Sequence, residues 1–140
     1  MRFFSLKAGF DAERAVRVLR QKSIALSDKI DLYPLIERIG DARIVMLGEA
    51  SHGTHEYYTW RSQISRWLIE KKHFNFIAVE GDWPDCYQLN LYIKSLTKER
   101  ENAFDVLKQF NRWPTWMWAN WEIVALAEWL KKKQPAKSSK

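Results

Sequence analysis

Two short, unbroken apolar runs enclose a helical apolar stripe near the middle of the chain. Residues 44–47 form the first run, and residues 74–79 form the second, interrupted only by Asn75. Short apolar runs of this kind are typical of strands that are covered on both faces. Between them, apolar residues from Tyr57 to Leu68 recur at helical spacing. The order strand, helix, strand predicts a βαβ unit with parallel strands and a right-handed crossover.

Helical patterns flank this unit on both sides. Asp11 and Asp31 begin two helical segments near the N-terminus, and Pro84 suits the first turn of another helix. Two more helices are expected over residues 100–110 and 117–132. We therefore predict an α/β fold, with one βαβ unit of a parallel sheet flanked by several helices. Two strands do not make a stable open sheet, so we expect a fragment of a larger α/β domain.

Charge and pattern divide the 140 residues into three parts. Residues 1–40 form an N-terminal helical segment, residues 41–130 the N-terminal part of the α/β domain, and residues 131–140 a basic disordered tail. The formal net charge is +6, but residues 31–130 carry eleven Lys and Arg against fourteen Asp and Glu. The positive charge therefore lies at the two ends. The tail has no aromatic residues to stack on bases, so we expect no nucleic-acid binding.

The composition excludes several classes of protein. Eight tryptophans and 46% hydrophobic residues exclude a disordered chain. A single cysteine, Cys86, excludes a disulfide framework and a cysteine-based zinc cluster. No run approaches eighteen apolar residues, so we expect no membrane association. The N-terminal residues lack the features of a signal peptide, which favours a cytoplasmic protein. We expect no cofactor.

The candidate chemistry lies in the sequence LGEASHGTHE, which follows the first predicted strand directly. Ligands of open α/β sheets bind outside the carboxyl ends of the strands, where Glu49 and His52 fall. Glu80 ends the second strand at the same edge, so the three side chains are predicted to converge. A histidine held by a carboxylate can act as a general base on water. A nearby arginine, for which Arg61 is the candidate, stabilises negative charge on a carbonyl oxygen.

These residues also have ordinary structural explanations. Glu49 can cap the following helix, His52 can lie in an exposed loop, and Arg61 can extend its charged end into water. Glu49, His52 and Glu80 also form an alternative metal-ligand set, although their spacing is not that of the H-E-x-x-H motif, and we expect no metal. The tryptophans within residues 113–121 can line an apolar substrate cleft or belong to the core.

Three segments resemble the erythromycin esterase family in their order and separation: GEASHGTHEYYTWR, FNFIAVEGDWPDCYQLN and RWPTWMWANWEI. The resemblance covers residues 40–130. It implies an α/β hydrolase that cleaves carboxylic esters, in the best-known members a macrolide lactone. It also implies that His52 activates water without an acyl-enzyme, and that Glu49, Glu80 and Arg61 belong to the same site.

The chain departs from the family pattern in three respects. Members are typically several hundred residues long, a further site histidine has no counterpart here, and Ala119 stands where relatives tend to carry an arginine. The sequence therefore predicts a truncated hydrolase acting on a small-molecule ester, which we expect to be inactive alone. The alternative is a non-catalytic remnant or a small binding module that self-associates through exposed apolar surface.

Overall fold

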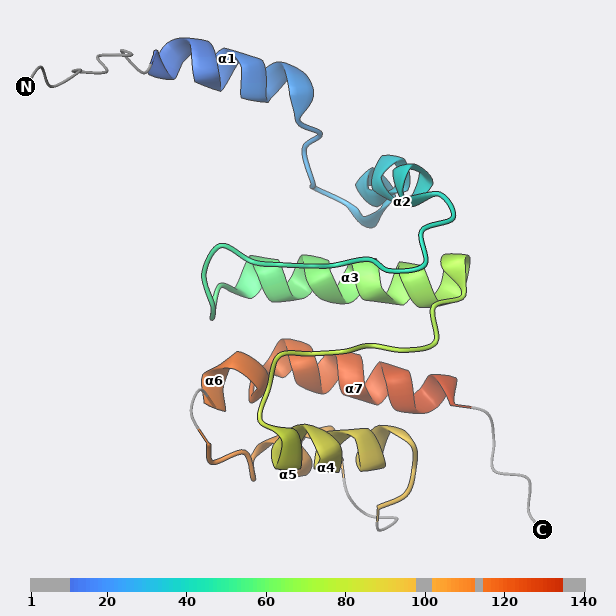
Figure 1. The fold of residues 1–140 in the computed structure, drawn as a ribbon. Helices are drawn as coiled ribbons and strands as arrows, with labels where there is room; N and C mark the ends of the chain where they lie inside the picture. The colour runs from blue at the N-terminus through green and yellow to red at the C-terminus, as the bar shows by residue number, and fades with distance from the viewer. Residues whose placement is uncertain (1–10, 98–101, 113–114, 135–140) are drawn as a thin grey trace, which may run out of the picture. The chain divides into compact units, whose positions relative to one another are not determined.

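The computed structural model describes residues 11–97, 102–112 and 115–134. The chain forms two compact units, Met1–Arg38 and Ile39–Lys140. Every regular element in the described ranges is a helix (Figure 1). The candidate site belongs to the second unit, which is therefore described in more detail.

The first unit contains three short helices: α1 (Ala12–Lys22), the 3-10 helix η1 (Lys29–Leu32) and α2 (Tyr33–Ile39), which extends one residue past its boundary. Asp11 precedes α1, as the sequence predicts, and its carboxylate accepts a hydrogen bond from the N–H of Arg14. Asp31 lies inside η1 instead of before it. Hydrogen bonds from the N–H groups of Asp28 and Ser27 hold the pKa of Asp31 below its usual value.

The second unit is built around its last helix. Its described helices are α3 (His55–Lys72), α4 (Trp83–Ile93), α5 (Ala103–Leu107), α6 (Thr115–Trp118) and α7 (Trp121–Lys133). Helix α7 contacts α3, α4 and α5, and it runs beside α3 in Figure 1. The buried side chains gather where these helices meet: Tyr58, Tyr92, Ala103, Val106, Leu107, Ile123 and Ala127.

Several helix boundaries follow the sequence signals. Thr54 precedes α3, and the helix ends at Lys72. Asp82 precedes α4, and Pro84 lies in its first turn, where a proline costs no intrahelical hydrogen bond. The predicted place of Pro84 in a first helical turn is thus confirmed, and α3 spans the predicted stripe from Tyr57 to Leu68.

The helix predicted over residues 117–132 is instead two helices, α6 and α7, with Asn120 between them. The Asn120 side chain accepts a hydrogen bond from the N–H of Ile123 at 3.0 Å and so begins α7. Its amide group also donates to the carbonyls of Trp116 and Met117 at the end of α6. One side chain therefore closes one helix and opens the next, which an apolar period alone does not indicate.

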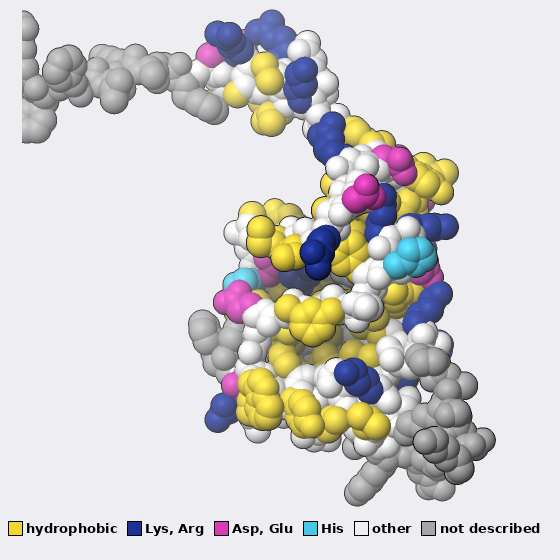
Figure 2. Space-filling view, turned by 45° about the vertical axis from the view of Figure 1, so that its right-hand side comes forward, with side chains coloured by type: hydrophobic (Ala, Val, Ile, Leu, Met, Phe, Trp, Pro, Cys, Tyr) yellow, Lys and Arg dark blue, Asp and Glu magenta, His cyan; other side chains and the backbone are white. Residues whose placement is uncertain are grey.

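The predicted α/β fold is wrong for the described residues, which contain helices but no strand and no sheet. The two apolar runs are extended chain without ladder hydrogen bonds. In the second run Phe76 is 78% exposed, and in the first Met46 is 90% exposed. Figure 2 shows hydrophobic side chains on the surface. A parallel pair needs further strands and cover on both faces, and a short apolar run does not by itself distinguish a paired strand from an extended segment.

Candidate active site

Glu49 is the centre of a cluster of polar side chains beside the start of α3. Along the extended segment before it, Val45 and Leu47 are half-buried while Ile44 and Met46 are exposed. Side chains alternate along extended chain, so Glu49 shares the inward face of Val45 and Leu47. Its side chain is only 5% exposed. Glu49 therefore points into the protein and does not act as the N-cap of α3.

His52 is oriented by this carboxylate. Its Nδ1 lies 2.6 Å from Oε1 of Glu49. An ionised carboxylate only accepts hydrogen bonds, so we assign the hydrogen to Nδ1, which leaves the lone pair of a neutral ring on Nε2. No described residue bonds to Nε2, and the side chain is 46% exposed. The Trp116 ring lies 5.9 Å away, centroid to centroid.

Arg61 binds the other oxygen of Glu49 from inside α3. Its Nη1 donates to Oε2 of Glu49 at 2.7 Å. Its guanidinium carbon lies 4.5 Å from the centroid of the Tyr58 ring and 5.7 Å from that of Trp118, so the cation contacts two aromatic rings. Its Nη2 is buried and has no hydrogen-bond acceptor among the described residues. Arg61 therefore does not extend into water.

Tyr58 is a member of this cluster that the sequence pattern missed. The apolar stripe was predicted to include Tyr57, but Tyr57 is exposed and Tyr58 is 2% exposed. The Tyr58 hydroxyl donates to Oε1 of Glu49 at 3.4 Å and accepts from the N–H of Gly53 at the same distance. The available signal was its position three residues before Arg61, because such residues are neighbours on a helix.

Glu80 does not bring its carboxylate to the cluster. Its backbone carbonyl accepts a hydrogen bond from Nε1 of Trp118 at 2.9 Å, while its side chain is exposed and bonds to no described residue. The absence of a side chain at Gly81 lets the backbone pass close to Cys86 and Trp118. A Cβ there would lie 2.6 Å from Sγ of Cys86 and 3.0 Å from Nε1 of Trp118. Trp118 connects Glu80 to Arg61 in the described part of the chain, and a catalytic role for Glu80 stays a prediction.

A second histidine–carboxylate pair lies nearby. Nδ1 of His55 bonds to Glu122 in the first turn of α7, and its Nε2 lies 3.4 Å from the hydroxyl of Thr59. His55 and Glu122 are far apart in the sequence, so no local pattern predicts the pair. The described ranges contain no group of three His, Cys, Asp or Glu side chains suited to a metal ion.

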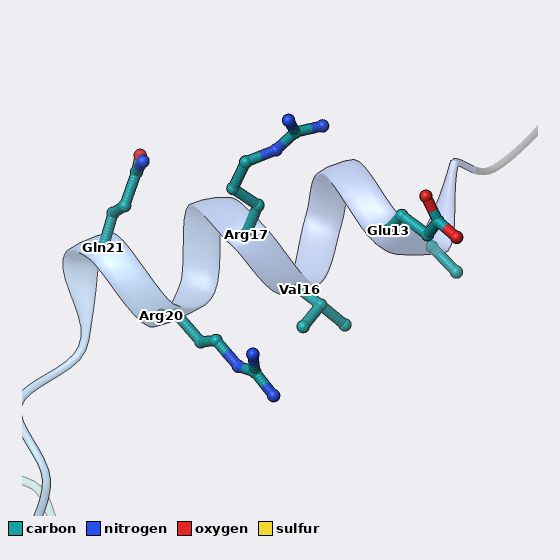
Figure 3. A pocket seen from close by; sticks show the side chains of 6 residues that line it. Glu13, Val16, Arg17, Arg20 and Gln21 are labelled. Carbon is teal, nitrogen blue, oxygen red and sulfur yellow. The ribbon is translucent and has the colours of Figure 1, made fainter.

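The hollow in Figure 3 lies on the first unit and has no comparable chemistry. It is lined by six residues of α1 alone: Ala12, Glu13, Val16, Arg17, Arg20 and Gln21. The labelled side chains in Figure 3 leave the helix in different directions and enclose no space. One exposed helix surface does not surround a ligand as binding pockets do. We therefore assign no site there.

Comparison with known proteins decides the family. The family model described as erythromycin esterase matches residues 69–140, just over half of the chain. The chain belongs to the erythromycin esterase family. An Escherichia coli protein described as erythromycin esterase type II is 36% identical over 63 residues, which are 45% of this chain and 15% of that relative. No solved structure matches the chain.

Membership of the erythromycin esterase family confirms the resemblance read from the sequence. The matched region includes Glu80 and Trp118 but begins after Arg61. The grouping of Glu49, His52 and Arg61 is therefore supported by their contacts and not by this match. Their catalytic roles stay predictions.

Proposed function

We propose that this chain carries part of a site that hydrolyses carboxylic esters, with water activated by His52. The observation that carries the proposal is the buried Glu49 carboxylate, which holds His52 on one oxygen and Arg61 on the other. Membership of the erythromycin esterase family supports a hydrolase. The name of the Escherichia coli relative makes a macrolide lactone the first ester to test.

His52 supplies the base in the proposed reaction. Its Nε2 takes a proton from a water molecule, and the water oxygen attacks the ester carbonyl carbon. The bond from that carbon to the leaving oxygen then breaks, and His52 returns the proton to the departing alcohol. Glu49 fixes the ring orientation and stabilises the imidazolium that forms between the two proton transfers.

Arg61 supplies the proposed stabilisation of negative charge. As the water oxygen attacks, the carbonyl oxygen becomes an oxyanion, and a preorganised donor lowers the energy of that state. Nη1 of Arg61 is occupied by Glu49, whereas Nη2 has no acceptor among the described residues. Because Nη2 is buried, the protein around it must rearrange before a carbonyl oxygen can reach it.

Hydrolysis of a chromogenic acetyl ester and of a macrolide lactone by the purified chain tests this proposal. His52→Ala is expected to lower kcat/KM by about 10²- to 10⁴-fold, the usual contribution of a general base. His73→Asn is the matched control, because His73 is exposed, outside the cluster and left-handed at φ 59°, a conformation that asparagine tolerates. Equal cleavage by wild type and His52→Ala would overturn the assignment. No cleavage by wild type would overturn the proposal for this chain and would agree with the expectation from the sequence that it is inactive alone.

Self-association is the second candidate function, and two exposed aromatic pairs favour it. Trp83 stacks on Tyr87 and Phe104 stacks on Trp121, each with ring centroids 5.2 Å apart. Both tryptophans are more exposed than buried, and exposed apolar surface of this kind favours association. Sedimentation velocity over a range of concentrations distinguishes the candidates, because self-association requires a sedimentation coefficient that rises with concentration.

No helix in the described part of the chain has the length and apolar character needed to cross a bilayer. The cytoplasmic location expected from the sequence stays a prediction. Fractionation of cells that express the chain, followed by immunoblotting of each fraction, tests it.

A further inference from the structure

We propose that Tyr58 is the positioning residue of this site, an inference that rests on the proposed hydrolytic function. Tyr58 holds the two groups assigned to the chemistry, His52 and Arg61, in one arrangement. It acts on His52 through Glu49 and through the loop at Gly53, and on Arg61 through its ring. It is not assigned any contact with the reacting atoms.

The hydroxyl of Tyr58 joins the loop to the helix. It accepts from the N–H of Gly53 and donates to Oε1 of Glu49, both at 3.4 Å. Gly53 adopts a left-handed backbone with φ of 81°, and Glu49 and His52 lie just before it. A hydroxyl that is buried needs hydrogen-bond partners, and these two long bonds are the ones the structure gives it. Hydrogen bonds at catalytic sites are often long before substrate binds.

The same hydroxyl shares a carboxylate oxygen with His52. Oε1 of Glu49 accepts hydrogen bonds from Nδ1 of His52 and from the Tyr58 hydroxyl. Oε2 accepts a hydrogen bond from Nη1 of Arg61. Three donors therefore fix the plane of one carboxylate. Removing the hydroxyl leaves Oε1 with a single donor, so Glu49 and the attached His52 gain freedom to rotate.

The ring of Tyr58 has a separate effect on Arg61. The guanidinium carbon lies 4.5 Å from the centroid of this ring, within the range of a cation–π contact. The Trp118 ring lies 5.7 Å from the same carbon. The ring contact and the bond from Nη1 to Glu49 together hold the guanidinium, and Nη2 is buried with no acceptor among the described residues. Tyr58 thus differs from a purely apolar core residue in using both its ring and its hydroxyl.

Tyr58→Phe separates these two effects, because it removes the hydroxyl and keeps the ring. We expect the Gly53 amide hydrogen to exchange faster and the His52 ring signals to shift in NMR spectra of the purified chain. We expect kcat to fall about tenfold, which corresponds to the loss of roughly one hydrogen bond to a charged group, with KM unchanged. Tyr57→Phe is the matched control, since Tyr57 is exposed on the same helix. It is expected to change none of these readings.

Unchanged Gly53 exchange and unchanged His52 signals in Tyr58→Phe would overturn the positioning role, whatever the activity. If both change while the wild-type chain hydrolyses no ester, the positioning role stands and the proposed function fails. Tyr58→Leu provides a second comparison, because it removes the ring as well. A melting temperature lowered equally by Tyr58→Phe and Tyr58→Leu, with no change at His52, would make Tyr58 a purely structural residue and overturn the proposal.

Discussion

Glu49 and Glu128 are two carboxylates that each accept a hydrogen bond from an almost fully buried tyrosine. The Tyr92 hydroxyl donates to Oε1 of Glu128 at 2.7 Å, as the Tyr58 hydroxyl does to Oε1 of Glu49 at 3.4 Å. Their remaining partners differ. Those partners decide which carboxylate stabilises the fold and which serves the candidate site.

The group around Glu128 is closed. The same Oε1 accepts the N–H of Ala103 at 2.9 Å, so one carboxylate joins α4, α5 and α7. The N–H of Ala103 and the Tyr92 hydroxyl hold the pKa of Glu128 below its usual value. Burial, together with Glu128, raises the pKa of Tyr92. All of these groups are used in holding helices together.

The group around Glu49 is open. His52 is half exposed and its Nε2 bonds to no described residue, while Nη2 of Arg61 has no acceptor in the described part of the chain. A half-exposed base and a buried donor without an acceptor therefore remain after the carboxylate has been satisfied. The comparison teaches that a buried carboxylate alone does not mark a site, whereas one that orients unused groups does.

After that of His52→Ala, the largest expected effect tests the open group. Arg61→Lys keeps the positive charge but removes the planar guanidinium. In wild type, Nη1 of that group binds Glu49 while Nη2 has no acceptor among the described residues. We expect ester hydrolysis to fall by about 10²- to 10³-fold, as on loss of one oxyanion donor. Arg112→Lys is the control, because Arg112 pairs with Asp82 at 3.0 Å outside the cluster. Equal losses in both variants would contradict the special role of Arg61.

The next effect tests the closed group. Glu128→Gln removes the negative charge of the group that accepts hydrogen bonds from the Tyr92 hydroxyl and the N–H of Ala103. We expect the free energy of unfolding to fall by about 1.5–3 kcal/mol, the usual range for a hydrogen bond to a charged group. Chemical denaturation measures this loss, and hydrolysis well below the melting temperature should be unchanged. A loss of activity without a loss of stability would reverse the comparison.

The hydrogen-bonded pair of Glu128 and Tyr92 also predicts how the stability of the fold depends on pH. Because the pKa of Glu128 is lowered from 4.5, its contribution is present above that pH and is lost as the pH falls further. Because the pKa of Tyr92 is raised from 10.0, its contribution is present below that pH and is lost as the pH rises further. The difference in melting temperature between wild type and Glu128→Gln should therefore shrink below about pH 4.5. A constant difference down to about pH 3 would contradict this assignment.

Gly81→Ala tests whether strain outside the cluster reaches it. The new Cβ would meet Sγ of Cys86 and Nε1 of Trp118, and we expect a loss of about 1–3 kcal/mol from overpacking. Gly48→Ala is the control, since a Cβ there meets nothing within 4 Å. Adding Cys86→Ala to Gly81→Ala should restore part of the stability. Differential scanning calorimetry of the four proteins would contradict the prediction if both glycine variants melted alike.

The smallest effect tests whether any histidine–carboxylate pair suffices. His55 pairs with Glu122, but its side chain is 68% exposed and its Nε2 already lies near Thr59. We expect His55→Gln to change the free energy of unfolding by less than about 1 kcal/mol, as for other exposed pairs. Hydrolysis should not change. A loss of activity as large as that of His52→Ala would mean that the cluster has been assigned to the wrong histidine.

Local signals predicted part of this structure and long-range partners account for the rest. Pro84 and the stripe from Tyr57 to Leu68 predicted two helices. Glu49, His52 and Arg61 lie together without the predicted sheet edge because they are at most 12 positions apart. The prediction of two strands failed because strand pairing depends on residues outside each apolar run. Glu128 was missed because its partners, Tyr92 and Ala103, lie 36 and 25 positions away.

The short spacing of the site also has a kinetic consequence. His52, Tyr58 and Arg61 lie 3, 9 and 12 positions after Glu49. Closing so short a loop costs little chain entropy, and contacts of low sequence separation form early in folding. The cluster around Glu49 is therefore able to assemble as soon as the first half of α3 is formed, whereas the cluster around Glu128 must wait until α7 has docked on α4 and α5.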